Sequence, residues 1–261
     1  MINYFWKNIT SKPKVAVLIV GEYRTFPNCR KTMLFLNQPE LDIDVYVSTW
    51  DQTNTLNPEV STLTPTAPIY QPVTKEQIEK DIGIPITCAI HKREEISAIL
   101  PIIRGWLLGF DLLRKSSKQY DYVLLLRPDT FFENVNDKFN SYLTPNHFKK
   151  YKTRIGVRPT PDLDGGTGAL PDNLFFSTYD NLDKFFTKLF DYWELNGTTH
   201  RRMWHEMLYT YVTEELKLSF MPPPITAQYV IARYPINENT TFNEAEQLWR
   251  KWFRENNRHV N

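Results

Sequence analysis

Three apolar runs of the chain are each followed directly by a segment that contains glycine, arginine or aspartate. The segments are Gly21–Thr25, Thr49–Asp51 and Arg127–Asp129. Short apolar runs rich in β-branched residues are typical of strands that are buried on both faces of a parallel sheet. Because such sheets bind ligands beyond the carboxyl ends of their strands, the three segments are expected to form one site.

Asp129 carries the most informative chemistry of the three segments. It closely follows the apolar residues 123–126 and precedes Thr130, Phe131 and Phe132. A carboxylate in that position can hold a hard divalent cation, which prefers oxygen ligands. An ordinary turn at the end of a strand explains the same residues, since Pro and Asp are both common in turns. The pattern alone leaves both interpretations open.

The hydrophobic pattern between these segments alternates strands with helices. Strands are predicted at 14–20, 43–48, 122–126, 154–157, 172–177 and 228–234. Helices are predicted at 29–36, 74–81, 94–115, 179–195, 201–216 and 242–256, with an extended surface excursion over 54–72. Such alternation predicts an α/β fold, with a mainly parallel sheet that carries helices on both sides.

Composition excludes several functional classes. The 261 residues carry 31 Lys+Arg against 30 Asp+Glu, a net charge of +1, so no strong field attracts nucleic acid or an anionic membrane surface. No apolar run approaches the roughly 20 residues that span a bilayer. The first residues lack the pattern of a signal peptide, and the 2 cysteines suit a reducing compartment. A soluble, cytoplasmic chain without a transmembrane segment is expected.

The motifs around the three segments together resemble glycosyltransferases. The residues concerned are Lys14–Gly21 followed by Arg24-Thr25-Phe26, then Ser48-Thr49-Trp50-Asp51, then Tyr120-Asp121-Tyr122-Val123 leading into Arg127-Pro128-Asp129. They look like the small GT-A-type glycosyltransferases of viruses, phages and bacterial surface-polysaccharide clusters, including the WavE-like proteins. The resemblance covers roughly residues 14–215. It implies one GT-A-like domain over 1–261, with a nucleotide-sugar half at about 14–130 and an acceptor half at about 131–261.

For the donor side, the resemblance implies a nucleoside diphosphate sugar whose diphosphate is bound through Mn²⁺ or Mg²⁺ held by an Asp-x-Asp motif. Arg127 stands here at the place of the first aspartate and Asp129 at that of the last. Either Asp129 alone contacts the metal, or Arg127 neutralises part of the phosphate charge directly. Metal dependence is therefore left open.

The resemblance also assigns nucleotide-binding roles to the loop from Gly21 to Arg24 and to Asp51. The loop from Gly21 to Arg24 is expected under the base and ribose, with Arg24 reaching the diphosphate. Asp51 is expected to accept hydrogen bonds from the base or ribose. Arg104 either points to the nucleotide or extends its charged end to solvent from the edge of an apolar helix face.

Asp172 is the first candidate for the catalytic base, because it opens an acid-plus-aromatic strand similar to one in this group of enzymes. An inverting transfer needs a carboxylate that takes the proton of the acceptor hydroxyl, whereas a retaining one does not need it in that role. Glu206 is the second candidate, although the helical pattern alone predicts a solvent-facing charge. His205 and His259 are possible metal ligands, and His259 lies close to the end of the chain.

Aromatic residues make up 14% of the chain, and several flank the expected site. Those expected to stack on a sugar or base are Trp50, Phe131, Phe132, Phe175 and Phe176. The preferred function is sugar transfer to a hydroxyl of a glycan or glycolipid acceptor. The alternatives are a sugar nucleotidyltransferase and a non-catalytic module that binds a nucleotide or glycan. Signatures of P-loop hydrolases, dinucleotide-binding proteins, zinc proteases and esterases are absent.

Overall fold

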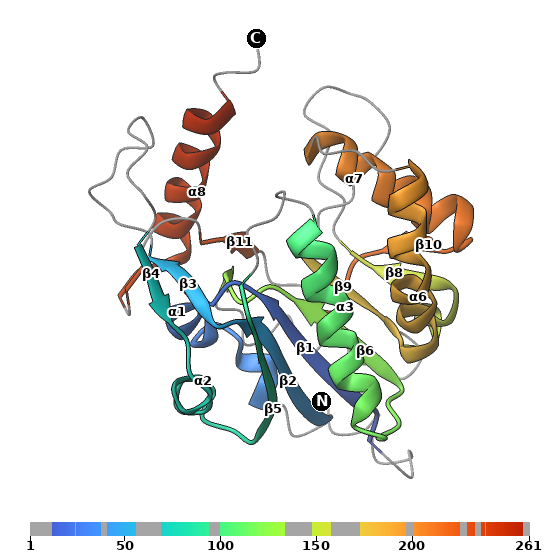
Figure 1. Ribbon diagram of the computed structural model, residues 1–261, viewed down its shortest axis with the longest axis horizontal. Coiled ribbons are helices and arrows are strands. Elements are labelled where there is room, and N and C mark those ends of the chain that lie inside the picture. Colours follow the sequence, from blue (N-terminus) through green and yellow to red (C-terminus); the bar gives the residue numbers. More distant parts are fainter. Residues whose placement is uncertain are drawn as a thin grey trace, which may run out of the picture.

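The computed structural model describes residues 12–23, 25–37, 41–55, 69–93, 100–133, 148–157, 173–196, 201–224, 229–232, 236–237 and 239–257. A seven-stranded sheet forms the centre of the molecule, in the order β10-β8-β9-β6-β1-β2-β5 (Figure 1). Its strands are β1 (Lys14–Gly21), β2 (Asp42–Trp50), β5 (Ile86–His91), β6 (Tyr122–Leu126), β8 (Arg154–Gly156), β9 (Leu174–Thr178) and β10 (Ser219–Met221). Of these seven, β9 alone runs against the others. The predicted α/β class with a mainly parallel sheet is confirmed.

Helices cover both faces of the sheet. They are α1 (Phe26–Arg30), α2 (Lys75–Ile82), α3 (Leu100–Lys115), α6 (Tyr179–Asn196), α7 (Arg201–Thr210) and α8 (Phe242–Asn257). A π-helical turn, η4 (Tyr211–Glu215), continues α7, and 3₁₀ turns occur at η2 (Leu34–Asn37) and η3 (Lys150–Thr153). Two short antiparallel pairs complete the described elements: β3 (Gln52–Thr55) with β4 (Ile69–Pro72), and β7 (Thr130–Phe132) with β11 (Tyr229–Ile231). In the described residues, no helix has the length and apolar character to cross a membrane.

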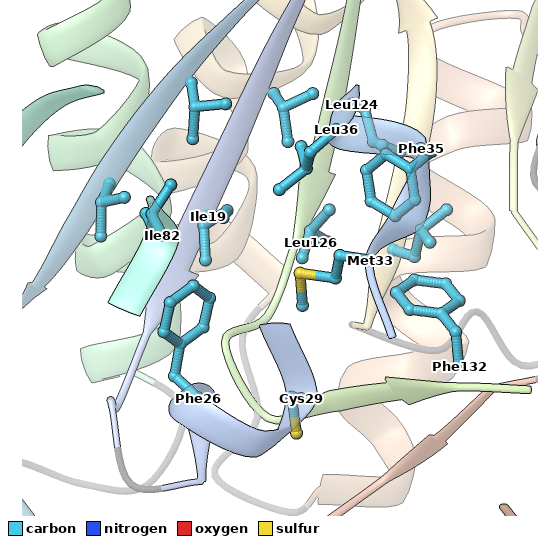
Figure 2. Close-up of a cluster of buried hydrophobic side chains, with 14 of the residues drawn as sticks. Ile19, Phe26, Cys29, Met33, Phe35, Leu36, Ile82, Leu124, Leu126 and Phe132 are labelled. Carbon is cyan, nitrogen blue, oxygen red and sulfur yellow. The ribbon is translucent and has the colours of Figure 1, made fainter. Parts of the chain in front are cut away.

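Strand β1 shows how the sequence divides the core into two layers. Its alternate residues Val15, Val17 and Ile19 join a cluster with residues of α1, α2 and α8, whereas Ala16, Leu18 and Val20 join a second cluster with α3, α6 and α7. Figure 2 shows the first cluster, with Ile19 of the sheet near Phe26. The alternation follows from the two-residue period of a strand, so a continuous apolar run is buried on both faces.

Most of the aromatic side chains belong to this core rather than to a ligand site. The Trp106 ring of α3 lies 5.3 Å from the Phe175 ring and 6.0 Å from the Trp204 ring, between centroids. Phe131, Phe132, Phe175 and Phe176 are each at most 5% exposed, so the expectation that they flank a ligand is wrong. Their burial stabilises the two clusters instead. Among the five aromatics proposed for stacking, Trp50 is the partly exposed one.

The structure differs from the sequence prediction in several short regions. The predicted helix over 29–36 is divided into α1 and η2, because a turn separates them. The predicted excursion over 54–72 begins and ends in the β3–β4 hairpin, and its residues 56–68 lie outside the described residues. The sequence analysis missed β5, β7 and β10, of which β7 and β10 have only three residues each.

Close packing of α3 on the sheet gives the first prediction. A Cβ atom at Gly109 would lie 2.6 Å from Val20 Cγ2, whereas at Gly105, one turn earlier, the nearest atom would be Val20 Cγ1 at 3.5 Å. Gly109→Ala is therefore expected to lower the free energy of unfolding by about 1–3 kcal/mol through overpacking. Gly105→Ala is the matched control and should raise it by about 0.5–1 kcal/mol, the gain of replacing a helical glycine. Urea denaturation measures both, and equal effects would contradict the prediction.

Candidate functional site

The carboxyl ends of the parallel strands β1, β2 and β6 bring the three predicted segments together. Thr49 Oγ1 donates a hydrogen bond of 2.7 Å to the carbonyl oxygen of Gly21. Gly21 has a φ of +136°, and a Cβ atom there would lie 3.2 Å from Pro128 Cδ. Only glycine readily adopts this backbone conformation, which also lets the segment after β6 approach β1. Gly21 thus allows the end of β1 and the segment after β6 to pack closely together.

Arg127 and Asp129 form a two-pronged ion pair at this edge. Arg127 Nε donates to Asp129 Oδ1 and Nη2 donates to Oδ2, both at 2.8 Å. The Asp129 side chain is 0% exposed, and that of Arg127 is 12% exposed. A turn after β6 makes this possible, since Thr130 N–H donates to the Arg127 carbonyl oxygen at 3.2 Å. Such paired, charge-assisted bonds fix the plane of the guanidinium.

This arrangement does not fit the predicted metal site. Hard cations such as Mn²⁺ or Mg²⁺ need carboxylate oxygens directed at the ion, but each Asp129 oxygen already accepts a hydrogen bond from Arg127. Across the described part of the chain, no group of three or more His, Cys, Asp or Glu side chains is placed to hold a metal. Asp129 is instead arranged to hold Arg127.

Asp51 connects the ends of β2 and β5. Its backbone N–H donates to the His91 carbonyl oxygen at 2.7 Å, and its Oδ1 accepts from the Arg93 backbone N–H at 2.8 Å. Arg93 in turn reaches the segment after β1, where its Nη1 donates to Glu22 Oε1 at 2.6 Å. Asp51 therefore orders the turn after β5 at the predicted site. The sequence analysis did not select Glu22 or Arg93, although recognising β5 as a fourth strand would have directed attention to the residues after His91.

The segment between β1 and α1 is fastened on its other side by Tyr23. The Tyr23 hydroxyl donates to Asp81 Oδ2 at 2.5 Å, and Gln77 Nε2 donates to the same oxygen at 2.8 Å. Burial, followed by this hydrogen bond, raises the pKa of Tyr23 well above its ordinary value. The hydroxyl thus remains a donor at physiological pH. The side-chain bonds of Glu22 and Tyr23 thus hold the backbone just before Arg24. Arg24 itself lies outside the described residues.

A distant part of the chain completes the edge. Strand β11 pairs with β7, and the Ala232 N–H donates to the Asp129 carbonyl oxygen at 2.8 Å. Thr25 Oγ1 donates to the Ala232 carbonyl oxygen at 3.4 Å. Asn28 of α1 also donates to the carbonyl oxygen of Ile236. These bonds attach Ala232 and Ile236 to the segments that follow β1 and β6.

Arg104 lies at the same edge, at the beginning of α3. It precedes Gly105, where a Cβ atom would be 3.5 Å from Val20 Cγ1 and 3.8 Å from Trp50 Cζ2. Glu206 follows Trp204, whose ring packs on Trp106 two residues after Arg104. The two predicted residues therefore come from helices that pack together near this edge (Figure 1). Glu206 is half-buried rather than fully solvent-facing, in contrast to the helical pattern.

Asp172 lies outside the described residues, but its neighbour in the chain does not. The carbonyl oxygen of Asn173 accepts a hydrogen bond of 3.2 Å from the Arg127 backbone N–H. Antiparallel pairing of β9 with β6 explains this contact, because it sets Leu174 opposite Leu126. Asp172 thus directly precedes, in the chain, a residue that bonds to the Arg127 backbone. His259 also lies outside the described residues.

His91 adds a pH-dependent group beside the edge. Its Nε2 lies 3.0 Å from Ser48 Oγ, and its ring meets Trp50 edge to face. Burial lowers the pKa of His91 below its ordinary value. In the unfolded chain a histidine has a pKa of about 6.5, so below that pH the unfolded state binds more protons than the folded state.

This difference predicts that stability falls as the pH drops from about 6.5 towards the lowered pKa of His91. His91→Gln keeps a polar side chain and removes the titration, so its stability should change less over the same interval. Urea denaturation at several pH values from neutral to about 5 measures both proteins. Equal pH slopes for the two would contradict the assignment.

Comparison with known proteins finds many similar structures, of which two are described here. No protein-family model and no curated protein sequence matches the chain. The apo-form glycosyltransferase GlyE of Streptococcus pneumoniae TIGR4 shares 12% identity over 81% of this chain, with a TM-score of 0.40. This chain spans 45% of the GlyE chain. A glycosyltransferase involved in the glycosylation of the major capsid of PBCV-1 shares 12% identity over 91% of this chain and all of its own, with a TM-score of 0.39. Both are glycosyltransferases, the class that the sequence motifs resemble.

Proposed function

We propose that the chain is a glycosyltransferase, which moves a sugar from a nucleoside diphosphate sugar to a hydroxyl of a glycan or glycolipid. The observation that carries the proposal is the meeting of Gly21, Asp51 and the Arg127–Asp129 pair at the carboxyl edge of the parallel strands. Ligands of α/β sheets bind at this edge. A fixed guanidinium there suits a diphosphate, whose oxygens pair well with its N–H groups.

The donor is proposed to lie across the ends of β1, β2 and β6. Glycine at position 21 allows a ligand to approach the backbone closely, and Trp50, partly exposed at the end of β2, offers an aromatic face to a base or sugar. Arg24, from the segment after β1, and Arg104, from α3, are proposed to add positive charge for the diphosphate. Asp51 has one oxygen committed to Arg93 N–H, and its other oxygen is the proposed acceptor for a ribose hydroxyl.

Asp172 is proposed as the base of an inverting transfer. The acceptor oxygen attacks the anomeric carbon of the sugar while the bond from that carbon to the diphosphate oxygen breaks. The acceptor proton passes to the carboxylate, and the nucleoside diphosphate leaves with the electron pair of the broken bond. Support comes from the chain path, since Asn173 touches the Arg127 backbone. Glu206, on the helix packed against α3, is the second candidate.

Both cysteines, Cys29 and Cys88, are free thiols. Free thiols persist in a reducing compartment, and we propose the cytoplasm as the place of action, with a donor and a glycan or glycolipid acceptor as partners. The balanced charge of +1 does not favour nucleic acid as a partner.

Donor binding tests the proposal directly. Thermal unfolding is measured against UDP-, GDP-, CMP- and dTDP-sugars, each with EDTA or with Mn²⁺, and the best donor is then titrated by calorimetry. A ligand at 100 times its Kd stabilises the folded state by about 2.7 kcal/mol, which is a clear rise in Tm. A rise with a UDP-, GDP- or dTDP-sugar supports the proposed site, and release of the nucleoside diphosphate together with formation of the glycosylated acceptor then shows transfer. Absence of any rise would overturn the proposal, while binding without turnover would indicate a non-catalytic module.

A further inference from the structure

We infer that the chain binds the diphosphate of its donor without a divalent metal, with Arg127 as the phosphate-binding group and Asp129 as the residue that positions it. This inference rests on the proposed function and concerns the same site. It assigns to Asp129 a role different from the metal ligand that the motif resemblance implies.

First, the Asp129 carboxylate is fully buried and fully paired with Arg127. Both of its carboxylate oxygens accept hydrogen bonds from Arg127 at 2.8 Å, and its side chain is 0% exposed. Its backbone is also held, because its carbonyl oxygen accepts the Ala232 N–H at 2.8 Å. A metal could reach these oxygens only after Arg127 had left them. That exchange would break a buried, two-pronged charge pair, which is strongly unfavourable.

The second argument is that Arg127 is the accessible member of the pair. Its side chain is 12% exposed while that of Asp129 is fully buried. Of these two side chains, a ligand that arrives at the carboxyl edge therefore meets the Arg127 guanidinium and not the Asp129 carboxylate. Two of the five N–H donors of the guanidinium are used by Asp129.

The third argument is that Arg127 is held in place before any ligand binds. Its backbone N–H donates to Asn173, its carbonyl oxygen accepts from Thr130, and its side chain is fixed by Asp129. The next residue, Pro128, packs against Gly21 at the end of β1. A guanidinium that is already ordered loses little conformational freedom when it binds phosphate. This is the arrangement expected of a group that replaces a metal.

The fourth argument concerns the other carboxylates of this edge. Glu22 accepts a hydrogen bond from the Arg93 side chain at 2.6 Å, and Asp51 accepts one from the Arg93 backbone at 2.8 Å. The described residues contain no group of three or more His, Cys, Asp or Glu side chains placed to hold a metal. The acidic residues at this edge thus order neighbouring segments.

The test is calorimetric titration of the full chain with the best donor of the panel, once in EDTA and once with Mn²⁺. The expected Kd is the same, within about threefold, in both conditions. Arg127→Lys keeps a positive charge but loses the fork that binds both Asp129 and phosphate. It should weaken donor binding about 10- to 100-fold, the range for lost hydrogen bonds to charged groups. Asp129→Asn should also weaken binding, because it loosens the position of Arg127.

Arg114→Met is the matched control, because Arg114 forms an ion pair with Asp183 on a remote face, between α3 and α6. Its donor Kd should not change, and circular dichroism with Tm confirms that each variant is folded. A Kd at least tenfold weaker in EDTA than with Mn²⁺ would overturn the inference but leave the proposed function intact. An unchanged Kd in Arg127→Lys would also overturn it. If no donor binds in either condition, the proposed function fails and the inference fails with it.

Discussion

We expect Arg127→Met to lower the free energy of unfolding by about 3–5 kcal/mol, the cost of removing one partner from a buried ion pair. The substitution leaves the Asp129 carboxylate, which is 0% exposed, without the guanidinium that contacts both of its oxygens. A loss of this size is a large part of the 5–15 kcal/mol that typically separates folded from unfolded proteins. Urea denaturation at pH 7 measures it.

Two comparisons separate a buried-charge effect from lost packing. The double variant Arg127→Met/Asp129→Leu contains no unpaired charge, so it should recover most of the stability. Arg114→Met, at a pair with exposed fractions of 34% and 40%, is expected to cost less than about 1 kcal/mol. A double variant no more stable than Arg127→Met would contradict the buried-charge explanation.

Asp172→Asn is expected to lower kcat for sugar transfer about 10²- to 10⁴-fold, the usual contribution of a general base. Asparagine has nearly the shape of aspartate but cannot take the acceptor proton. The expectation rests on the proposed role of Asp172 as the base, for which the chain path gives the support: the carbonyl oxygen of Asn173, the next residue, accepts a hydrogen bond from the Arg127 backbone. Transfer to the acceptor, or to water when no acceptor is present, measures the effect.

The donor Kd of Asp172→Asn should stay close to that of the unmodified chain, because the base acts on the acceptor. Asp164→Asn is the control, since Asp164 is a nearby aspartate, beside Gly165 and Gly166 in the sequence, for which no catalytic role is proposed. Glu206→Gln should change kcat much less. A large loss in Glu206→Gln together with normal turnover in Asp172→Asn would assign the base to Glu206 instead.

The central architecture could be predicted because it depends on local patterns. Continuous apolar runs identified β1, β2 and β6, and the three- and four-residue spacing of apolar residues identified α3. The rule that ligands bind at carboxyl ends of parallel strands then selected Gly21, Asp51 and the Arg127–Asp129 turn, which the structure brings to one edge.

The features that the sequence did not reveal depend on long-range pairing. Strands β7 and β10 have three residues each, too few for a periodic signal, and exist because a partner strand lies beside them. The Glu22–Arg93 ion pair joins residues 71 positions apart, and no local pattern indicates it. Arg127 and Asp129 were both selected, but their mutual pairing follows from the turn geometry after β6. That geometry pairs Asp129 with Arg127 through both of its carboxylate oxygens, which no local pattern indicated.

The attachment of β11 to the segments after β1 and β6 has a consequence for the order of folding. Thr25 and Ala232 are 207 positions apart, and Asn28 and Ile236 are 208 apart. Contacts between such distant residues form slowly, since a long loop must close before they stabilise anything. During synthesis, the apolar runs of β1, β2 and β6 are all available well before Ala232 leaves the ribosome. The β1–β2–β6 part of the sheet can therefore pair before β11 is available to join its carboxyl edge.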